Sequence, residues 1–289
     1  MVSLSQNCHE VFLNNINFIR YGKKNGYPII FLHGFPGSAK HGFIFHQWAE
    51  EFGVEIFSLD RPGYGLTLPT KEKGLKSWTS LFQHFLTSHK IEQFSVIGIS
   101  GGAPYAVAIA SAFPQKVKKL GIICGLAPWT FRSSAFSPIQ NIALSLFRRV
   151  PESVMNPFLS WGFINEDYGQ TLDKLASRLN SADQETLAMP EIRKIMIEGM
   201  IQARRQGFLG IQNDLYQYSR PWPVEWDKII MPCHLWYGLE DLMLNPKMAK
   251  IFKQKIPQIK IRYFESEGHF SLPILRAKEI LDDFTKDSI

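Results

Sequence analysis

The sequence lacks the long apolar run that a membrane-spanning helix needs. No window of its 289 residues reaches the roughly 18 uninterrupted apolar residues of such a helix. Residues 1–20 contain no basic segment followed by a long apolar core, so we expect no signal peptide. The formal charge is +6, but no lysine and arginine run is as long as a typical nucleic-acid-binding patch. We therefore expect neither an integral membrane segment nor a nucleic-acid partner.

Cysteine is scarce, and the chain has three: Cys8, Cys124 and Cys233. Three cysteines cannot all pair, and two of these lie in apolar, strand-like runs, so we interpret them as buried free thiols. Such thiols are typical of a reducing compartment, which predicts a cytoplasmic protein. Their spacing is not that of a zinc site, so no metal is expected, and no organic cofactor is implied. The sequence carries no indication of oligomeric state.

What the sequence does contain is a series of short apolar runs that alternate with segments of helical spacing. Strands are expected at 9–21 (two short ones around a turn), 28–32, 54–59, 94–97, 120–124, 234–237 and 260–265, and helices at 43–52, 77–89, 103–112, 246–255 and 273–285. Strands that are apolar throughout are buried on both faces. The alternation therefore predicts an α/β fold, with a mostly parallel sheet flanked by helices.

One stretch of about a hundred residues differs from the rest of the chain. Residues 128–227 have helical periodicity and few strand candidates, and prolines lie near both ends of the stretch. We interpret it as a helical insertion between two parts of one core domain, residues 1–127 and 228–289.

The most informative motif is the G-x-S-x-G run that ends at Gly102. Its serine, Ser100, follows the predicted strand at 94–97 directly and precedes the predicted helix at 103–112. Such a sharp turn strains the backbone at its apex and exposes the apical side chain, and the flanking glycines prevent collisions. The motif also occurs by chance in turns without chemistry. Its place between a strand and a helix favours a nucleophile at Ser100, near the positive end of the helix.

A serine nucleophile needs a base and an orienting acid. His269 is the candidate base because it follows the last predicted strand, at the sheet edge where open α/β sheets bind ligands. The acid is expected after the preceding strand, where Glu240 and Asp241 are adjacent. We favour Asp241, with Glu240 as the alternative. The order serine, acid, histidine along the chain is one that such triads use.

The oxyanion formed by nucleophilic attack needs preorganised hydrogen-bond donors. The backbone N–H of Gly101, directly after the nucleophile, is one candidate. The second is the N–H of Phe35, in the loop after the first buried strand. Pro36 has no N–H, and we interpret His33 as a structural residue of the same loop.

With these parts in place, the chain resembles the α/β-hydrolase family. The matching residues are His33-Gly34-Phe35-Pro36-Gly37, Asp60-Arg61-Pro62-Gly63-Tyr64-Gly65, Gly98-Ile99-Ser100-Gly101-Gly102, Gly238 with Asp241, and Gly268-His269. The resemblance implies an eight-stranded, mostly parallel sheet with a helical cap domain, here residues 128–227, over the active site. Dehalogenases and epoxide hydrolases of this fold carry an aspartate where this chain has Ser100. Proline iminopeptidases usually carry tryptophan at the position of Gly101.

The sequence therefore predicts a serine hydrolase that cleaves a small, mostly apolar carboxylic ester through an acyl-enzyme intermediate. Thioester, lactone or carbon–carbon bond hydrolysis on the same triad is an alternative, and so is a non-catalytic binder of small molecules. Four aromatic residues of the cap are expected either to line the substrate pocket or to form the core of the cap: Trp129, Phe131, Trp161 and Phe163.

Overall fold

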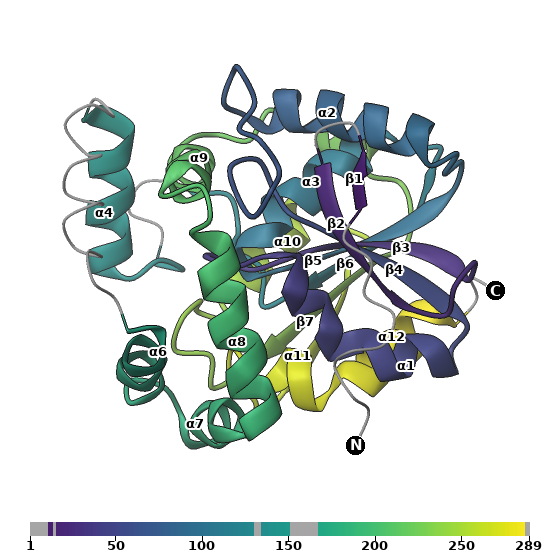
Figure 1. Ribbon diagram of the computed structural model, residues 1–289. Coiled ribbons are helices and arrows are strands. Elements are labelled where there is room, and N and C mark those ends of the chain that lie inside the picture. Colours follow the sequence, from purple (N-terminus) through teal and green to yellow (C-terminus); the bar gives the residue numbers. More distant parts are fainter. Residues whose placement is uncertain (1–10, 14–15, 130–133, 151–166, 287–289) are drawn as a thin grey trace.

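A computed structural model describes residues 11–13, 16–129, 134–150 and 167–286 (Figure 1). Within these residues eight strands form one sheet, in the order β1-β2-β4-β3-β5-β6-β7-β8. The strands are β1 (Val11–Leu13), β2 (Ile16–Gly22), β3 (Tyr27–Leu32), β4 (Val54–Leu59), β5 (Phe94–Ile99), β6 (Val117–Ile123), β7 (Cys233–Gly238) and β8 (Lys260–Phe264). Only β2 runs antiparallel to its neighbours, and every other pair of adjacent strands is parallel. The predicted fold class, an eight-stranded and mostly parallel sheet, is confirmed.

The centre of the sheet is buried on both faces, as the apolar runs predict. Every residue of β4 and of β5 is buried, whereas most residues of the edge strand β8 retain exposed surface. Cys124 and Cys233 are buried and free in this core, and Cys8 lies outside the described residues. The sheet therefore forms a rigid support, and its loops are left to carry the polar side chains.

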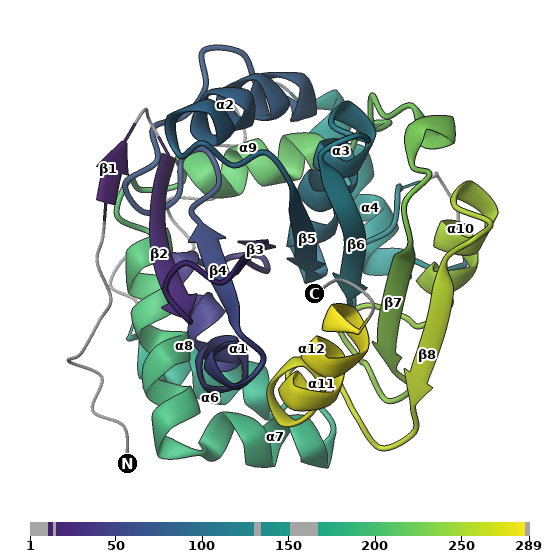
Figure 2. The ribbon, with the colours of Figure 1, turned by 90° about the vertical axis from the view of Figure 1, so that its right-hand side faces the viewer.

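Helices cover both faces of the sheet. They are α1 (His46–Glu51), α2 (Leu75–Ser88), α3 (Ala103–Ala112), α10 (Met248–Lys255), α11 (Ser271–Leu275) and α12 (Ala277–Thr285), with the 3-10 helices η1 (Ala39–Phe45), η2 (Ser100–Gly102) and η3 (Trp226–Lys228). Figure 2 shows α1 beside α12 on one face and α2 beside α3 on the other.

Two predicted helices are divided in the structure. The helix expected at 43–52 begins as η1, where the Ser38 side chain accepts a hydrogen bond from the Lys40 N–H, and becomes α-helical only at His46. The helix expected at 273–285 consists of α11 and α12, which meet at Arg276. The backbone of Arg276 leaves the helical region there, with φ of −104° and ψ of 14°.

The described residues between β6 and β7 fold largely into helices, as their periodicity predicts. The described ones are α4 (Pro138–Arg149), α6 (Tyr168–Ala176), α7 (Ser181–Ala188), α8 (Pro190–Ala203) and α9 (Leu209–Tyr218). We call them the inserted helices. They lie together beyond the carboxyl ends of the parallel strands (Figure 1), where α7 packs against α11 and α8 against η1. In the part of the chain that the structure describes, no helix is long and apolar enough to cross a membrane.

Candidate active site

The turn between β5 and α3 has the strained geometry that the motif predicts. Ser100 has a φ of +51°, a backbone conformation that residues other than glycine rarely adopt. A Cβ atom on Gly98 would lie 2.8 Å from the Gly102 carbonyl oxygen, and one on Gly102 would press against the backbone of Leu32. Both glycines are therefore required for the chain to turn so closely against β3.

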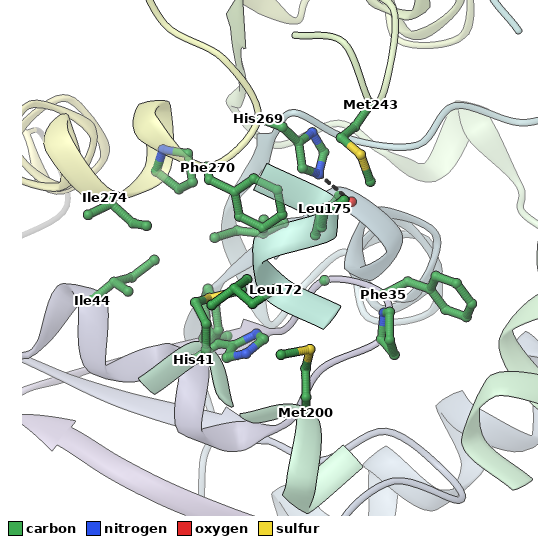
Figure 3. A pocket seen from close by; sticks show the side chains of 17 residues that line it. Phe35, His41, Ile44, Leu172, Leu175, Met200, Met243, His269, Phe270 and Ile274 are labelled. Carbon is green, nitrogen blue, oxygen red and sulfur yellow. Dashed lines mark hydrogen bonds between the residues drawn. The ribbon is translucent and has the colours of Figure 1, made fainter. Parts of the chain in front are cut away.

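Ser100, His269 and Asp241 form a hydrogen-bonded chain at this edge of the sheet. The Nε2 atom of His269 lies 2.9 Å from the Ser100 Oγ, a contact drawn as a dashed line in Figure 3. The Nδ1 atom of His269 lies 2.7 Å from Asp241 Oδ2. The other carboxylate oxygen, Oδ1, accepts the backbone N–H groups of Met243 and Leu244, each at 2.8 Å. Two backbone N–H groups thus hold the Asp241 carboxylate, and both ring nitrogens of His269 have a hydrogen-bond partner.

The structure distinguishes between the two candidate acids. Glu240 is exposed, and its carbonyl oxygen and carboxylate both accept from the Asn180 side chain of the inserted helices. Asp241 is buried and is the residue that contacts His269. Of the adjacent pair, only Asp241 is placed to orient the imidazole.

The environment of His269 favours its protonated form. Burial by itself lowers the pKa of an imidazole, because it penalises the charged state. The charge and hydrogen bond of Asp241, with a further contribution from the charge of Asp183, outweigh that effect and raise the pKa of His269 above its ordinary value. The His269 imidazole therefore binds a proton more firmly than an isolated imidazole does.

The two predicted oxyanion donors lie beside the nucleophile. Phe35 and Gly101 are close neighbours, since a Cβ atom on Gly101 would lie 2.7 Å from the Phe35 Cβ. A Cβ atom on Gly34 would lie 3.4 Å from that of Ser100. The loop after β3 therefore packs directly against the nucleophile turn.

A buried arginine, to which the sequence analysis gave no role, holds this loop. The Arg61 guanidinium donates to the carbonyl oxygens of His33 and Gly34, and it pairs with Asp214 of α9. The Asp214 carboxylate also accepts the hydroxyls of Tyr64 at 2.7 Å and Tyr105 at 2.6 Å. Arg61 lies in the family motif at residues 60–65, which the sequence shows. The residues around Asp214 form no motif that would have identified it as the partner of Arg61.

Two cavities meet at Ser100. One has a volume of about 260 Å³ and the other about 230 Å³, and Phe35, Met243 and His269 also line both. The first, shown in Figure 3, is enclosed by apolar side chains of η1, α6, α8 and α11. These include Ile44, Leu172, Leu175, Met196, Met200 and Ile274. The second lies under α4 and α9, against residues that include Leu126, Phe136, Leu144 and Leu215.

Among the described residues that line the first cavity, His41 has the one polar side chain besides Ser100 and His269. Burial, helped by the positive charge of Arg61, lowers the pKa of His41 to about 4. The imidazole is therefore neutral near pH 7, so His41 adds no charge to the walls of this cavity.

The aromatic residues expected to line the pocket are placed differently or are not described. Trp129 is buried in the main core, where its indole N–H donates to Asn141 Oδ1 at 3.1 Å, and it lines neither cavity. Phe131, Trp161 and Phe163 lie outside the described residues. Two of the methionines that line the first cavity, Met196 and Met200, share one face of α8 by their four-residue spacing.

One cluster in the described part of the chain has the donor set of a metal site. Atoms of Cys124, Asp241 and His269 lie within 4.8 Å of one another. The carboxylate and the imidazole are hydrogen-bonded to each other, and burial raises the pKa of the Cys124 thiol well above its ordinary value. The hydrogen bond between the imidazole and the carboxylate is the arrangement of an oriented base.

Comparison with known proteins gives the family. The family model of the α/β-hydrolase fold matches residues 27–273, which include the nucleophile turn, the acid and the histidine. The chain belongs to the α/β-hydrolase family. This membership and the esterases and other hydrolases among the relatives support a hydrolase activity.

This α/β-hydrolase is similar to several proteins over most of their length. It is 26% identical to the uncharacterized hydrolase YcgS of Bacillus subtilis (strain 168), over 84% of this chain and 85% of that one. It is 22% identical to the pimeloyl-[acyl-carrier protein] methyl ester esterase of Nitrosomonas europaea, over 85% of this chain and 89% of the other. A bromoperoxidase structure from Bacillus anthracis superposes with a TM-score of 0.72 at 19% identity, covering 94% of this chain and 96% of that chain. At that identity the likeness shows the fold alone.

Proposed function

We propose that this α/β-hydrolase is a serine hydrolase that cleaves small, mostly apolar carboxylic esters. The observation that carries the proposal is the hydrogen-bonded series Ser100–His269–Asp241, which lies where two apolar cavities meet. A serine hydroxyl beside an oriented imidazole is the arrangement of acyl transfer. An apolar wall on each side of the nucleophile suits an ester whose acyl and alcohol parts are both apolar.

In the proposed mechanism, His269 Nε2 removes the proton of Ser100 Oγ as the oxygen attacks the ester carbonyl. The backbone N–H groups of Phe35 and Gly101 stabilise the negative charge that develops on the carbonyl oxygen. The imidazolium, stabilised by Asp241, then donates its proton to the departing alcohol. A water molecule activated by the same imidazole hydrolyses the acyl-enzyme and regenerates Ser100.

Residues 128–227 are proposed as the cap domain of this site. The inserted helices supply most of the apolar lining beyond the sheet, through α6 and α8 on one side and α4 and α9 on the other. The Nitrosomonas europaea relative is named as a methyl ester esterase, which supports ester chemistry here.

The experiment is hydrolysis of a series of p-nitrophenyl esters by the parent protein and by Ser100→Ala. We expect the substitution to lower kcat by roughly a thousandfold or more, because the acyl-enzyme cannot form. Ser80→Ala, at an exposed serine of α2, is the control and should leave the rate unchanged. A Ser100→Ala protein with the parent rate would exclude the proposed mechanism.

A further inference from the structure

The inserted helices contact the candidate histidine loop through one buried carboxylate. Asp183 of α7 has no exposed surface. Its Oδ2 atom accepts the backbone N–H of His269 at 2.9 Å, and Oδ1 accepts those of Phe270 at 2.9 Å and Ser271 at 2.8 Å. One side chain thus satisfies three consecutive backbone donors of a loop that is more than eighty residues away in sequence.

These contacts have a clear physical reason. The first N–H groups of a helix have no partner within it, and α11 begins at Ser271, just after the histidine. Buried donors without partners are costly, and an ionised acceptor makes stronger hydrogen bonds than a neutral one. A Cβ atom on Gly268 would collide with the Asp183 carboxylate, so the loop approaches α7 as closely as its backbone allows.

The start of α7 also holds the loop of the candidate acid. The Asn180 side chain receives the backbone N–H of Asp183 at 2.8 Å and donates to the Glu240 carbonyl oxygen at 3.0 Å. Glu240 directly precedes Asp241. The histidine and the acid are therefore both fastened to the same turn of the same inserted helix.

In the described part of the chain, three titratable groups lie around the His269 imidazole. Asp241 faces it from the loop after β7, Asp183 from α7, and Cys124 from the end of β6. Burial keeps the Cys124 thiol and the neighbouring Tyr237 hydroxyl neutral, because it raises the pKa of each well above its ordinary value. Two carboxylates thus act on one imidazole, and Asp183 is the one without a side-chain hydrogen bond to the ring.

We propose that Asp183 is a positioning residue, which fixes the His269 backbone so that Nε2 reaches Ser100. The inserted helix α7 is then a part of the catalytic machinery as well as a cover over it. This inference rests on the proposed function, because it assigns a role in the same reaction. Asp183 lines neither cavity, so it acts on the reaction through His269 and not through contact with the substrate.

The test is Asp183→Asn, which keeps the shape and removes the charge and one acceptor. We expect kcat for p-nitrophenyl butyrate to fall by roughly tenfold to a hundredfold, as for a misplaced catalytic group, with KM nearly unchanged. The acid limb of the profile of kcat/KM against pH should move to lower pH, because a negative charge beside His269 is lost. Asp173→Asn, at an exposed aspartate of α6 that pairs with Arg193, is the matched control and should change neither quantity.

A second readout does not depend on turnover. Side-chain NMR of the histidines, with His269 assigned by its loss in His269→Gln, should show a lower pKa of His269 in Asp183→Asn than in the parent protein. A parent protein without esterase activity would contradict the proposed function, and the NMR titration would still test the placement of Asp183. An unchanged pKa of His269 would overturn the proposal, and so would an unchanged kcat in an active protein.

A milder variant distinguishes a folding defect from a loss of positioning. If Asp183→Asn does not fold by circular dichroism, Asn180→Ala removes the acceptor for the Asp183 backbone N–H and keeps the carboxylate. We expect a smaller loss in the same direction, in kcat and with KM unchanged. A folded Asn180→Ala protein with the parent kcat would then overturn the proposal.

Discussion

The guanidinium of Arg61 and the carboxylate of Asp214 form an ion pair in which neither side chain has any exposed surface. Arg61 lies in the core, just after β4, and Asp214 lies on the inserted helix α9, so the pair joins the two parts of the molecule. The same arginine holds the carbonyl oxygens of His33 and Gly34 in the candidate oxyanion loop. Burial of two charges is tolerated here because both are paired and hydrogen-bonded.

Breaking this pair should cost more than breaking a surface pair. Asp214→Ala leaves the Arg61 charge buried without its partner, and we expect the free energy of unfolding to fall by about 3 to 5 kcal/mol. Glu51→Gln breaks the exposed pair between Glu51 and Lys278 and should cost less than about 1 kcal/mol. Urea unfolding of both variants measures the difference. Equal losses in the two variants would show that the buried pair does not join core and insertion.

The raised pKa of His269 predicts the direction of the pH dependence of hydrolysis. His269 acts as a base only when neutral, so activity is present above its pKa in the folded protein and is lost as the pH falls through it. The midpoint of the acid limb of kcat/KM should therefore lie above the ordinary histidine value of about 6.5. In Asp241→Asn the limb should move to lower pH, with kcat reduced by about ten-thousandfold. A limb that stays in place in this variant would contradict the assignment of Asp241.

The lowered pKa of His41 predicts that part of the stability is also lost as the pH falls. In the unfolded chain His41 takes up a proton below about pH 6.5, but in the folded protein only below about 4. Its contribution to the free energy of unfolding should therefore fall as the pH drops between these values, by up to about 3 kcal/mol. His41→Leu lacks this loss. Its free energy of unfolding, relative to that of the parent, should therefore rise as the pH is lowered from about 7 to about 4.5. A pH-independent difference between the two proteins would contradict the buried, neutral imidazole.

The two cavities predict that the two parts of an ester are selected independently. Met200→Trp narrows the first cavity, and Ala143→Leu narrows the second. We expect one variant to shorten the longest acyl chain accepted and the other to shorten the longest alcohol chain, since each fills the space on one side of Ser100. Hydrolysis of two series of esters, with either the acyl or the alcohol part lengthened, measures both. Variants that both shorten the same part would contradict the assignment of one cavity to each part.

Much of the fold was predictable because its signals are local. The strand β4 begins and ends where the apolar run at 54–59 does. The turn at Ser100 is predicted by its flanking glycines, which the structure shows to be sterically required. The placement of Ser100, Asp241 and His269 followed from one topological fact. Each comes just after a parallel strand, and the carboxyl ends of such strands meet at one edge of the sheet.

The contacts between distant segments were not predictable. Asp183 and Asp214 are ordinary charged residues of helical stretches, and nothing near them in sequence shows that they are buried against the loops after β8 and β4. The lining of the cavities was missed for the same reason. Helical periodicity identifies an apolar face but does not say whether it packs on a neighbour or borders a cavity. Trp129, expected in the pocket or in the core of the cap, lines neither cavity and donates a hydrogen bond to Asn141 of α4.

The central claim is that Ser100 is an activated nucleophile, and covalent labelling tests it most directly. The parent protein is treated with a fluorophosphonate near neutral pH and analysed by mass spectrometry of the intact chain and of its peptides. We predict one adduct per chain, located on Ser100, no adduct in Ser100→Ala, and much slower labelling in His269→Ala. A parent protein that remains unlabelled, or that is labelled equally in Ser100→Ala, would contradict the account.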